Sequence, residues 1–136
     1  MGQADDIHEI RQLLALIFHA GDAFDVETWL DCYTDDALFH SPQIHMEGRD
    51  ELRAGFPALR GTSATRHWIG NIVVEVDGDE ATSVAYLLVV SATFPPVFMC
   101  SGVYHDRFRR VDGRWLFSER ILDLDGIEGA PAPVEG

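Results

Sequence analysis

The sequence predicts an α+β fold in which helices come first and an antiparallel sheet follows. Apolar residues recur with a helical period through roughly the first 60 positions and with the period of a strand afterwards. Two Asp-Gly turns, within 77–80 and at 112–113, lie between strand-like segments, as is typical of hairpins. Helices followed by an antiparallel meander are expected to pack on one face of a curved sheet, whose concave side can hold a small ligand.

Three helices are expected before the sheet. The first spans 5–23 and has one apolar stripe, made of Ile10, Leu13, Leu14, Ile17 and Phe18. Asp25 suits the N-cap of a second helix, which carries Trp29 on its apolar side. A third helix at 48–61 is expected to be distorted near Pro57, because proline lacks the N–H that a helix interior uses.

The remaining elements are strands. A turn and a short strand are expected within 34–41. Two hairpins follow, the first formed by 65–76 and 81–94 and the second by 102–111 and 114–122. Residues 126–136 are rich in Pro and Gly and are expected to form a flexible tail, so that 1–125 make up a single domain.

Composition argues against several classes of function. The net charge is −13, from 23 acidic and 10 basic residues, and such a surface repels nucleic acid and anionic lipid. No apolar run is long enough for a membrane span, and the acidic N-terminus is unlike a signal peptide, so we expect a cytoplasmic protein. Two cysteines are too few for a disulfide framework, and the histidines lack metal-ligand spacing, so we expect no metal site.

His67 is the histidine whose setting best suits chemistry. The alternate positions of its strand mix polar and apolar side chains, which suits a surface that faces a cavity: His67, Ile69, Asn71, Val73 and Glu75. A half-exposed strand with an incidental histidine would give the same pattern. The candidate partner is Asp22, at the shoulder of the first helix's apolar stripe, where a buried carboxylate would need a donor.

A pair of Asp22 and His67 would be suited to proton transfer. The carboxylate would fix the tautomer of the imidazole, orient the ring, and stabilise the imidazolium formed when the other ring nitrogen takes a proton. The alternative is that Asp22 only ends the first helix beside Gly21, as many aspartates at helix ends do.

Four segments taken in order resemble the SnoaL-like branch of the NTF2-like superfamily. They read GDAFDVETWLDCYTDDALF, GRDELRAGF, TRHWIGNIVVEVDGDEATSVAYLLV and GVYHDRFRRVDGRWLF, and the resemblance covers most of residues 5–122. It implies a cone-shaped barrel, with three N-terminal helices packed into a strongly curved, mixed and mainly antiparallel sheet around a deep pocket. The members that resemble the chain most include scytalone dehydratase, hexachlorocyclohexane dehydrochlorinase and bile-acid dehydratase.

The resemblance also implies roles for individual residues. Those enzymes use an aspartate at the end of the first helix and a histidine at the start of the first long strand, which correspond to Asp22 and His67. The histidine removes a proton and a leaving group departs, without a metal or an organic cofactor. The second catalytic histidine of scytalone dehydratase has no counterpart in VVSATF, and both Arg109 and Arg110 are candidates for a dehydrochlorinase-like arginine in the substrate site.

These observations together predict a cofactor-independent lyase or isomerase that acts on an apolar cyclic small molecule. Elimination and isomerisation stay open, and so does a route in which Asp22 itself is the base. The pocket-wall candidates are Phe18, Trp29, Trp68 and Tyr104, for which simple core packing is an equal alternative. The rival class is a non-catalytic binding or association module, such as a β subunit of a ring-hydroxylating dioxygenase. An apolar sheet face that needs covering predicts a homo-oligomer, a dimer or a trimer.

Overall fold

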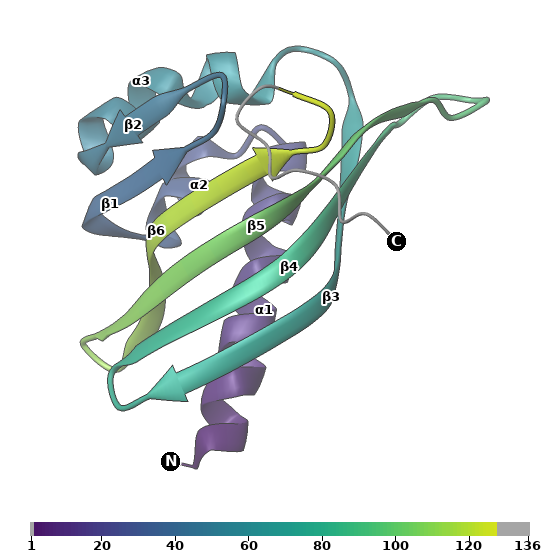
Figure 1. Cartoon of the computed structure of the whole chain (residues 1–136). Coiled ribbons are helices and arrows are strands. Elements are labelled where there is room, and N and C mark those ends of the chain that lie inside the picture. The colour runs from purple at the N-terminus through teal and green to yellow at the C-terminus, as the bar shows by residue number, and fades with distance from the viewer. Residues whose placement is uncertain (1, 128–136) are drawn as a thin grey trace.

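The computed structural model describes residues 2–127 and contains three helices and six strands over that range (Figure 1). The helices are α1 (Gln3–Asp22), α2 (Val26–Asp31) and α3 (Gly48–Arg60). The strands are β1 (Tyr33–His40), β2 (His45–Glu47), β3 (Thr65–Asp77), β4 (Glu80–Ser91), β5 (Phe98–Val111) and β6 (Arg114–Leu124). The flexible tail predicted for 126–136 lies outside the described residues from position 128 onward.

The six strands form one mixed sheet in the order β2-β1-β6-β5-β4-β3. The pair β1 and β6 is parallel, and the other neighbouring strands are antiparallel. Helix α1 runs along the inner face of the sheet, behind the strands in Figure 1, while α3 lies at the end that carries β1 and β2. The predicted α+β fold, with three helices packed on a curved and mainly antiparallel sheet, is confirmed.

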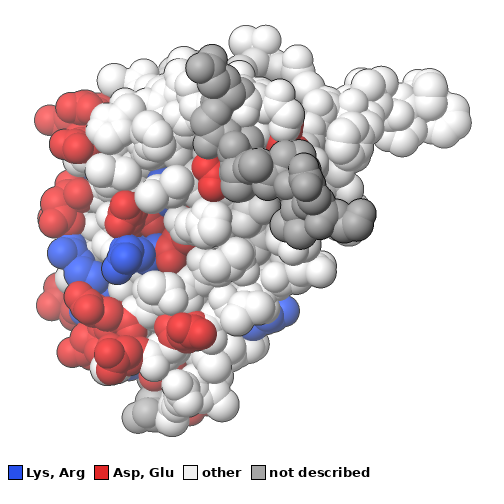
Figure 2. All heavy atoms as spheres, viewed as in Figure 1, with Lys and Arg blue, Asp and Glu red and all other residues white. Residues whose placement is uncertain are grey.

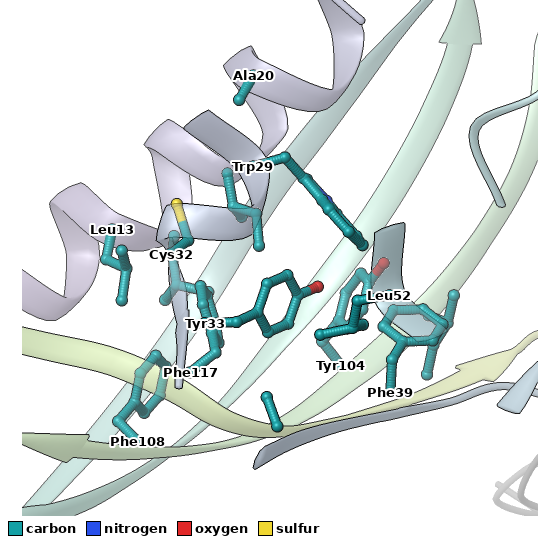
Figure 3. Packing of buried hydrophobic residues seen from close by; sticks show 14 of the residues in the cluster. Leu13, Ala20, Trp29, Cys32, Tyr33, Phe39, Leu52, Tyr104, Phe108 and Phe117 are labelled. Carbon is teal, nitrogen blue, oxygen red and sulfur yellow. The ribbon is translucent and has the colours of Figure 1, made fainter. Parts of the chain in front are cut away.

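The apolar stripe of α1 provides one wall of the core. Ile10, Leu14 and Ile17 are almost completely buried and belong to the same core cluster as aromatic side chains of the sheet. Figure 3 shows two of these aromatic side chains, Phe108 and Phe117, in the cluster below Leu13 of α1. Burying side chains of this size contributes about 1.5–3 kcal/mol each relative to leaving them in water. The helical period of the first segment is therefore what places α1 on the concave side of the sheet.

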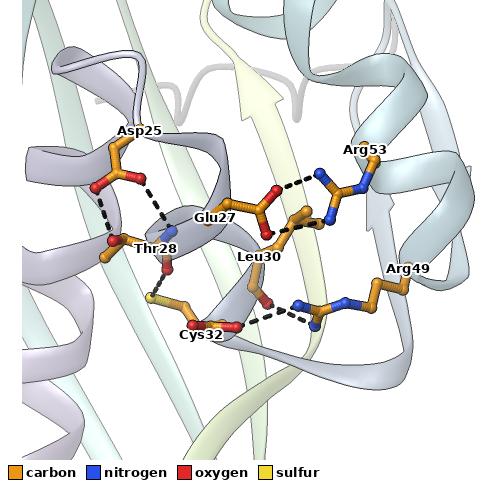
Figure 4. A network of polar contacts seen from close by, with 8 residues as sticks. Asp25, Glu27, Thr28, Leu30, Cys32, Arg49 and Arg53 are labelled. Carbon is orange, nitrogen blue, oxygen red and sulfur yellow. Dashed lines mark hydrogen bonds and ion pairs between the residues drawn. The ribbon is translucent and has the colours of Figure 1, made fainter.

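Short polar contacts fix α2 between α1 and α3 (Figure 4). Asp25 caps α2 as predicted, because its carboxylate accepts from the backbone N–H of Thr28 at 3.2 Å. Arg53 of α3 forms an ion pair with Glu27, and Arg49 donates to the carbonyl oxygen of Leu30 at 3.4 Å. These contacts hold α2 in place, and α2 in turn holds Trp29 in the core.

The largest departure from the sequence-based expectation lies in β3. The pairing with β4 shifts register between Gly70 and Val73, and Asn71 adopts a φ of 50° there. Asparagine tolerates this left-handed conformation better than most residues, and an extra residue at a bulge reverses which face the following side chains take. Thr65, His67 and Ile69 therefore face inward before the bulge, whereas the inward side chains after it are Ile72, Val74 and Val76.

The outer face of the sheet carries an apolar patch over β3 and β4, whereas exposed polar side chains such as His105 and Arg107 lie over β5. The exposed apolar side chains come from β3 and β4, and we define the outer face by Trp68, Val73, Val84, Tyr86 and Leu88. An arm between β4 and β5, residues 92–97, extends beyond the body of the sheet in Figure 1 and carries the almost fully exposed Phe94. In Figure 2 most charged side chains gather toward β1, β6 and the hairpin ends, and the surface over the arm and β3 is largely uncharged.

No helix between residues 2 and 127 combines the length and the apolar character that crossing a bilayer requires.

Candidate functional site

The last residue of α1 and the third residue of β3 meet in a two-point contact. The Oδ1 atom of Asp22 lies 2.6 Å from Nδ1 of His67, and Oδ2 accepts from the backbone N–H of His67 at 3.0 Å. Both side chains are largely enclosed, with 13% of Asp22 and 24% of His67 exposed. A charge-assisted hydrogen bond of this length holds the ring and the carboxylate in one fixed arrangement.

The contact also determines which ring nitrogen is available for chemistry. An ionised carboxylate only accepts hydrogen bonds, so the proton between the two groups belongs to Nδ1 of His67. Nε2 on the opposite side of the ring is then unprotonated in the neutral imidazole and can accept a proton. The ring of Phe18 stacks on His67, with centroids 5.5 Å apart and planes inclined by 16°, so the orientation of the imidazole is fixed on its face as well.

His67 forms part of the wall of a cavity of about 410 Å³ between the helices and the sheet. This volume lies in the range of small-molecule sites. The wall is mostly apolar and aromatic, and Phe18, Trp29 and Tyr104 belong to it, so three of the four predicted pocket-wall residues surround one space with His67. Asp22 stands behind His67 and lines a separate open groove between α1 and β3.

The fourth predicted wall residue, Trp68, lies elsewhere. It follows His67 on the strand, and consecutive residues of a strand face opposite sides, so Trp68 is 65% exposed on the outer face.

Neither candidate arginine reaches the cavity. Arg109 pairs with Asp36 at 2.6 Å on the surface, and Arg110 binds Asp6 at 2.9 Å and Asp79 at 3.0 Å near the far end of α1. The pairing of β5 with β6 shifts register between Arg107 and Phe108, just before the two candidate arginines. The alternation of polar and apolar residues in the sequence does not reveal this shift.

The cavity instead contains an arginine that the sequence reasoning missed. Arg120 of β6 is 1% exposed and lines the cavity, and it forms a two-point ion pair with the equally buried Asp106 of β5. The Nε–Oδ1 distance is 2.9 Å and the Nη2–Oδ2 distance is 3.1 Å. The guanidinium carbon also lies 4.0 Å from the ring centre of Tyr104 and 4.3 Å from that of Phe117. The sequence does contain a signal for this ion pair, because Asp106 and Arg120 lie at inward positions on the two strands of one predicted hairpin.

A tyrosine hydroxyl completes this polar group. The hydroxyl of Tyr33 is buried and has no hydrogen-bond partner among residues 2–127, although its ring lines the same cavity. Burial raises the pKa of Tyr33 well above its usual value, and the nearby positive charge of Arg120 opposes this rise. Burial likewise raises the pKa of Tyr104 to about 12. Both tyrosines are therefore neutral hydrogen-bond donors at physiological pH.

A metal-ligand cluster does not occur within residues 2–127, where no group of three or more His, Cys, Asp or Glu side chains is arranged to hold an ion. His40 and His45 face each other across the β1–β2 pair with their Nδ1 atoms 3.2 Å apart. Glu47 contacts the far nitrogen of His45, at 3.2 Å, so it does not converge with the two Nδ1 atoms. The expected absence of a cofactor stays a prediction.

Helices packed into a curved sheet around an apolar cavity, with titratable side chains in the wall, define a small α+β barrel built to hold a small molecule. Residues 2–121 match the family model of the SnoaL-like domain, and the chain belongs to this family. No curated protein matches the chain in sequence.

Solved structures agree with this assignment. A protein of unknown function from Mycobacterium tuberculosis is 31% identical, with a TM-score of 0.85, over 96% of this chain and 83% of that chain. A protein of unknown function with a cystatin-like fold from Nostoc punctiforme is 29% identical, with a TM-score of 0.84, over 96% and 97%. A protein from Novosphingobium aromaticivorans, named as a proposed scytalone dehydratase, is 22% identical, with a TM-score of 0.79, over 98% and 95%, and this last likeness shows the fold alone.

Proposed function

We propose that this SnoaL-like protein is a cofactor-independent lyase or isomerase that acts on an apolar cyclic small molecule. His67 is the general base, and Asp22 is its positioning residue. The observation that carries the proposal is the two-point contact of Asp22 with His67, which leaves Nε2 as the free ring nitrogen of a histidine in the cavity wall. General base catalysis by a positioned side chain contributes about 10²–10⁴-fold in rate.

The proposed reaction starts at a C–H bond next to an activating group of the substrate. Nε2 of His67 takes the proton, and the electron pair of the C–H bond passes to the activating group. In an elimination the pair then forms a C=C bond as the leaving group departs with its own bonding electrons. In an isomerisation a proton returns to a different carbon. Asp22 stabilises the imidazolium in both cases, because its charge lies 2.6 Å from Nδ1.

The geometry favours this assignment over Asp22 as the base. Both carboxylate oxygens of Asp22 already accept hydrogen bonds from His67, and Asp22 does not line the cavity. A substrate in the cavity therefore meets the imidazole first, and a direct transfer to Asp22 would require the pair to separate.

The rival is a non-catalytic binding or association module, and a proton-transfer assay separates the two. Purified protein would be incubated in D₂O with 2-tetralone and cyclohexanone, and exchange of the α-hydrogens followed by NMR. Formation of the enone from 3-hydroxycyclohexanone would be followed by absorbance. We expect turnover by the wild type, loss in His67→Gln, and no change in His105→Gln, since His105 is half exposed on another surface of the sheet. Rates no faster than buffer for all three compounds would favour the binding module.

We also propose that the chain assembles with a second copy of itself through the outer face and the arm. Their exposed side chains, with Phe98 and Met99 at the base of the arm, present on the order of 1,000 Å², against about 800 Å² per partner in a standard interface. The few charges on this surface suit a like-charged copy of a chain with net charge −13.

Light scattering tests the assembly. We expect an oligomer for the wild type, a monomer for Tyr86→Lys, and an unchanged oligomer for Leu16→Lys, which places the same charge on an exposed apolar position of α1. A monomeric wild type would contradict the proposal.

A further inference from the structure

A histidine pair lies outside the cavity, at the turn that joins β1 to β2. His40 and His45 are directly opposite each other in the antiparallel pairing, and both residues are exposed. Their Nδ1 atoms lie 3.2 Å apart, and the ring planes are inclined by 67°. Neither histidine lines the cavity whose wall contains His67, so the pair has no part in the proton transfer proposed above.

The distance between the two nitrogens matches the spacing of two ligands on one metal ion. Zn²⁺ binds an imidazole nitrogen at about 2.0–2.1 Å. Two such nitrogens on one ion are therefore about 2.8–3.4 Å apart, for angles at the metal between about 90° and 110°. The observed 3.2 Å lies within this range. A hydrogen bond between the two rings would give a similar distance, but it would need a proton on one of the two Nδ1 atoms.

The surroundings of His45 favour a free Nδ1 atom on that ring. The Oε1 atom of Glu47 lies 3.2 Å from Nε2 of His45, and an ionised carboxylate only accepts hydrogen bonds, so the proton of the neutral ring belongs to Nε2. The unprotonated Nδ1 atom then faces Nδ1 of His40. A carboxylate on the far nitrogen is also the usual outer contact of a metal-binding histidine, because it fixes the tautomer and orients the ring.

The turn between the two histidines is fixed by hydrogen bonds of its own. The Oγ atom of Ser41 accepts from the backbone N–H of Gln43 and from that of Ile44, both at 3.2 Å. The N–H of Ser41 donates to the carbonyl oxygen of Ile44 at 2.9 Å. The backbone positions of His40 and His45 are thereby set in advance, and an ion has only the two rings to order, which favours binding.

We propose that His40 and His45 bind one divalent metal ion of the kind that prefers imidazole, such as Zn²⁺, through their Nδ1 atoms. Water completes the coordination, Glu47 positions His45 from the outer side, and the net charge of −13 attracts cations to the surface. This inference goes beyond the proposed function and departs from the expectation of no metal site. The spacing of the histidines along the chain did not reveal the pair, because residues 41–44 fold back and bring the rings together.

A bound ion would cross-link β2, at the edge of the sheet, to β1. The two strands pair at only three residue positions. The turn between them contributes Ser41, Gln43 and Ile44 to the wall of the cavity. The role of the ion is therefore structural: it holds this part of the cavity wall in place without contacting the substrate.

Zinc binding to the full chain, measured by calorimetry on metal-free protein at about pH 7.5, tests the site. We expect one ion per chain, and an affinity at least about tenfold weaker in His40→Gln and in His45→Gln, since each loses one ligand. His105→Gln is the matched control and should bind as the wild type does. His105 is also half exposed beside a carboxylate, that of Asp123 at 3.4 Å, but it faces no second histidine. Mg²⁺, which prefers oxygen ligands, should not bind to the pair.

Two further measurements identify the ligand atoms and the outer contact. Zn²⁺ should shift the ¹⁵N NMR signals of both Nδ1 atoms, of His40 and of His45. Glu47→Gln keeps an oxygen that can accept from Nε2 and should bind Zn²⁺ as the wild type does, whereas Glu47→Ala should bind more weakly. Zn²⁺ at about 100 times its Kd should also raise the Tm of the wild type by roughly 5–10 °C, and should raise that of His40→Gln by less.

The inference is overturned if the wild type binds no Zn²⁺, or if His40→Gln and His45→Gln bind it as tightly as the wild type. Either result would leave a hydrogen bond between the rings as the full account of their contact. A shift of the Nε2 signals in place of the Nδ1 signals would also contradict the proposed ligands. Since the pair has no part in turnover, the outcome is independent of the proton-transfer assay.

Discussion

Asp22→Asn is the substitution that most sharply tests how the pair works. The two oxygens of Asp22 accept two different hydrogens, from the backbone N–H of His67 at 3.0 Å and from Nδ1 at 2.6 Å. An asparagine has only one acceptor. The backbone N–H of His67 can only donate a hydrogen bond, so the carbonyl oxygen of the amide should accept from it. The NH₂ group of the amide should then face the imidazole ring.

The consequence for His67 can be worked out from this geometry. An NH₂ group facing Nδ1 requires that nitrogen to become an acceptor, so the proton of the neutral ring moves to Nε2. An imidazole protonated at Nε2 is no base toward the cavity. The imidazolium also loses a charged hydrogen bond, worth about 1.5–3 kcal/mol. We therefore expect a rate loss of about 10²–10⁴-fold, the range that a general base contributes.

The assay is deuterium exchange into 2-tetralone at saturating ketone, with circular dichroism to verify that the fold is kept. A rate within about threefold of the wild type, measured on a folded Asp22→Asn variant, would refute the reasoning, because such a result would show that the tautomer of His67 does not depend on Asp22.

Two further predictions concern stability. Leu14→Ala should lower the free energy of unfolding by about 2–5 kcal/mol, measured by urea titration, because Leu14 is fully buried in the core; a loss below about 1 kcal/mol would contradict the packing. The hydrogen bond from Trp115 lowers the pKa of Asp6, burial opposes this effect, and Arg110 adds to the lowering. A lowered pKa stabilises the fold above the unfolded value near 4, and this stabilisation is lost as the pH falls through the folded value. Wild type should therefore lose more stability than Asp6→Asn between about pH 7 and pH 3, and equal losses in urea titrations at the two pH values would contradict the role of Asp6.

The helices and the hairpins could be predicted because their signals are local. The stripe of α1, the cap at Asp25 and the two Asp-Gly turns each act over a few neighbouring residues, and the structure has all of them close to the expected positions. The three-residue strand β2 was not predicted, because its conformation depends on pairing with β1 and has no period of its own.

In the candidate site, too, features that depend on neighbouring residues could be predicted better than features that depend on contacts between distant strands. The residue pattern alone left Asp22 either as a partner of His67 or as a residue that only ends the first helix, and the resemblance to SnoaL-like enzymes favoured the pair. Arg120 could not be placed as readily, because its burial depends on Asp106 on the neighbouring strand and on aromatic rings from α1, β5 and β6. The bulge after Gly70 likewise depends on the ladder with β4, and it changes which side chains of β3 face the core.

The most direct test of the central claim is the tautomer of the neutral His67 ring, measured by ¹⁵N NMR of the labelled protein over a range of pH without any ligand. We predict that the neutral form of the ring has its proton on Nδ1, bound to Asp22, and an unprotonated Nε2. The opposite tautomer, or a ring whose two tautomers interconvert as in a free imidazole, would contradict the assignment of His67 as a base held by Asp22.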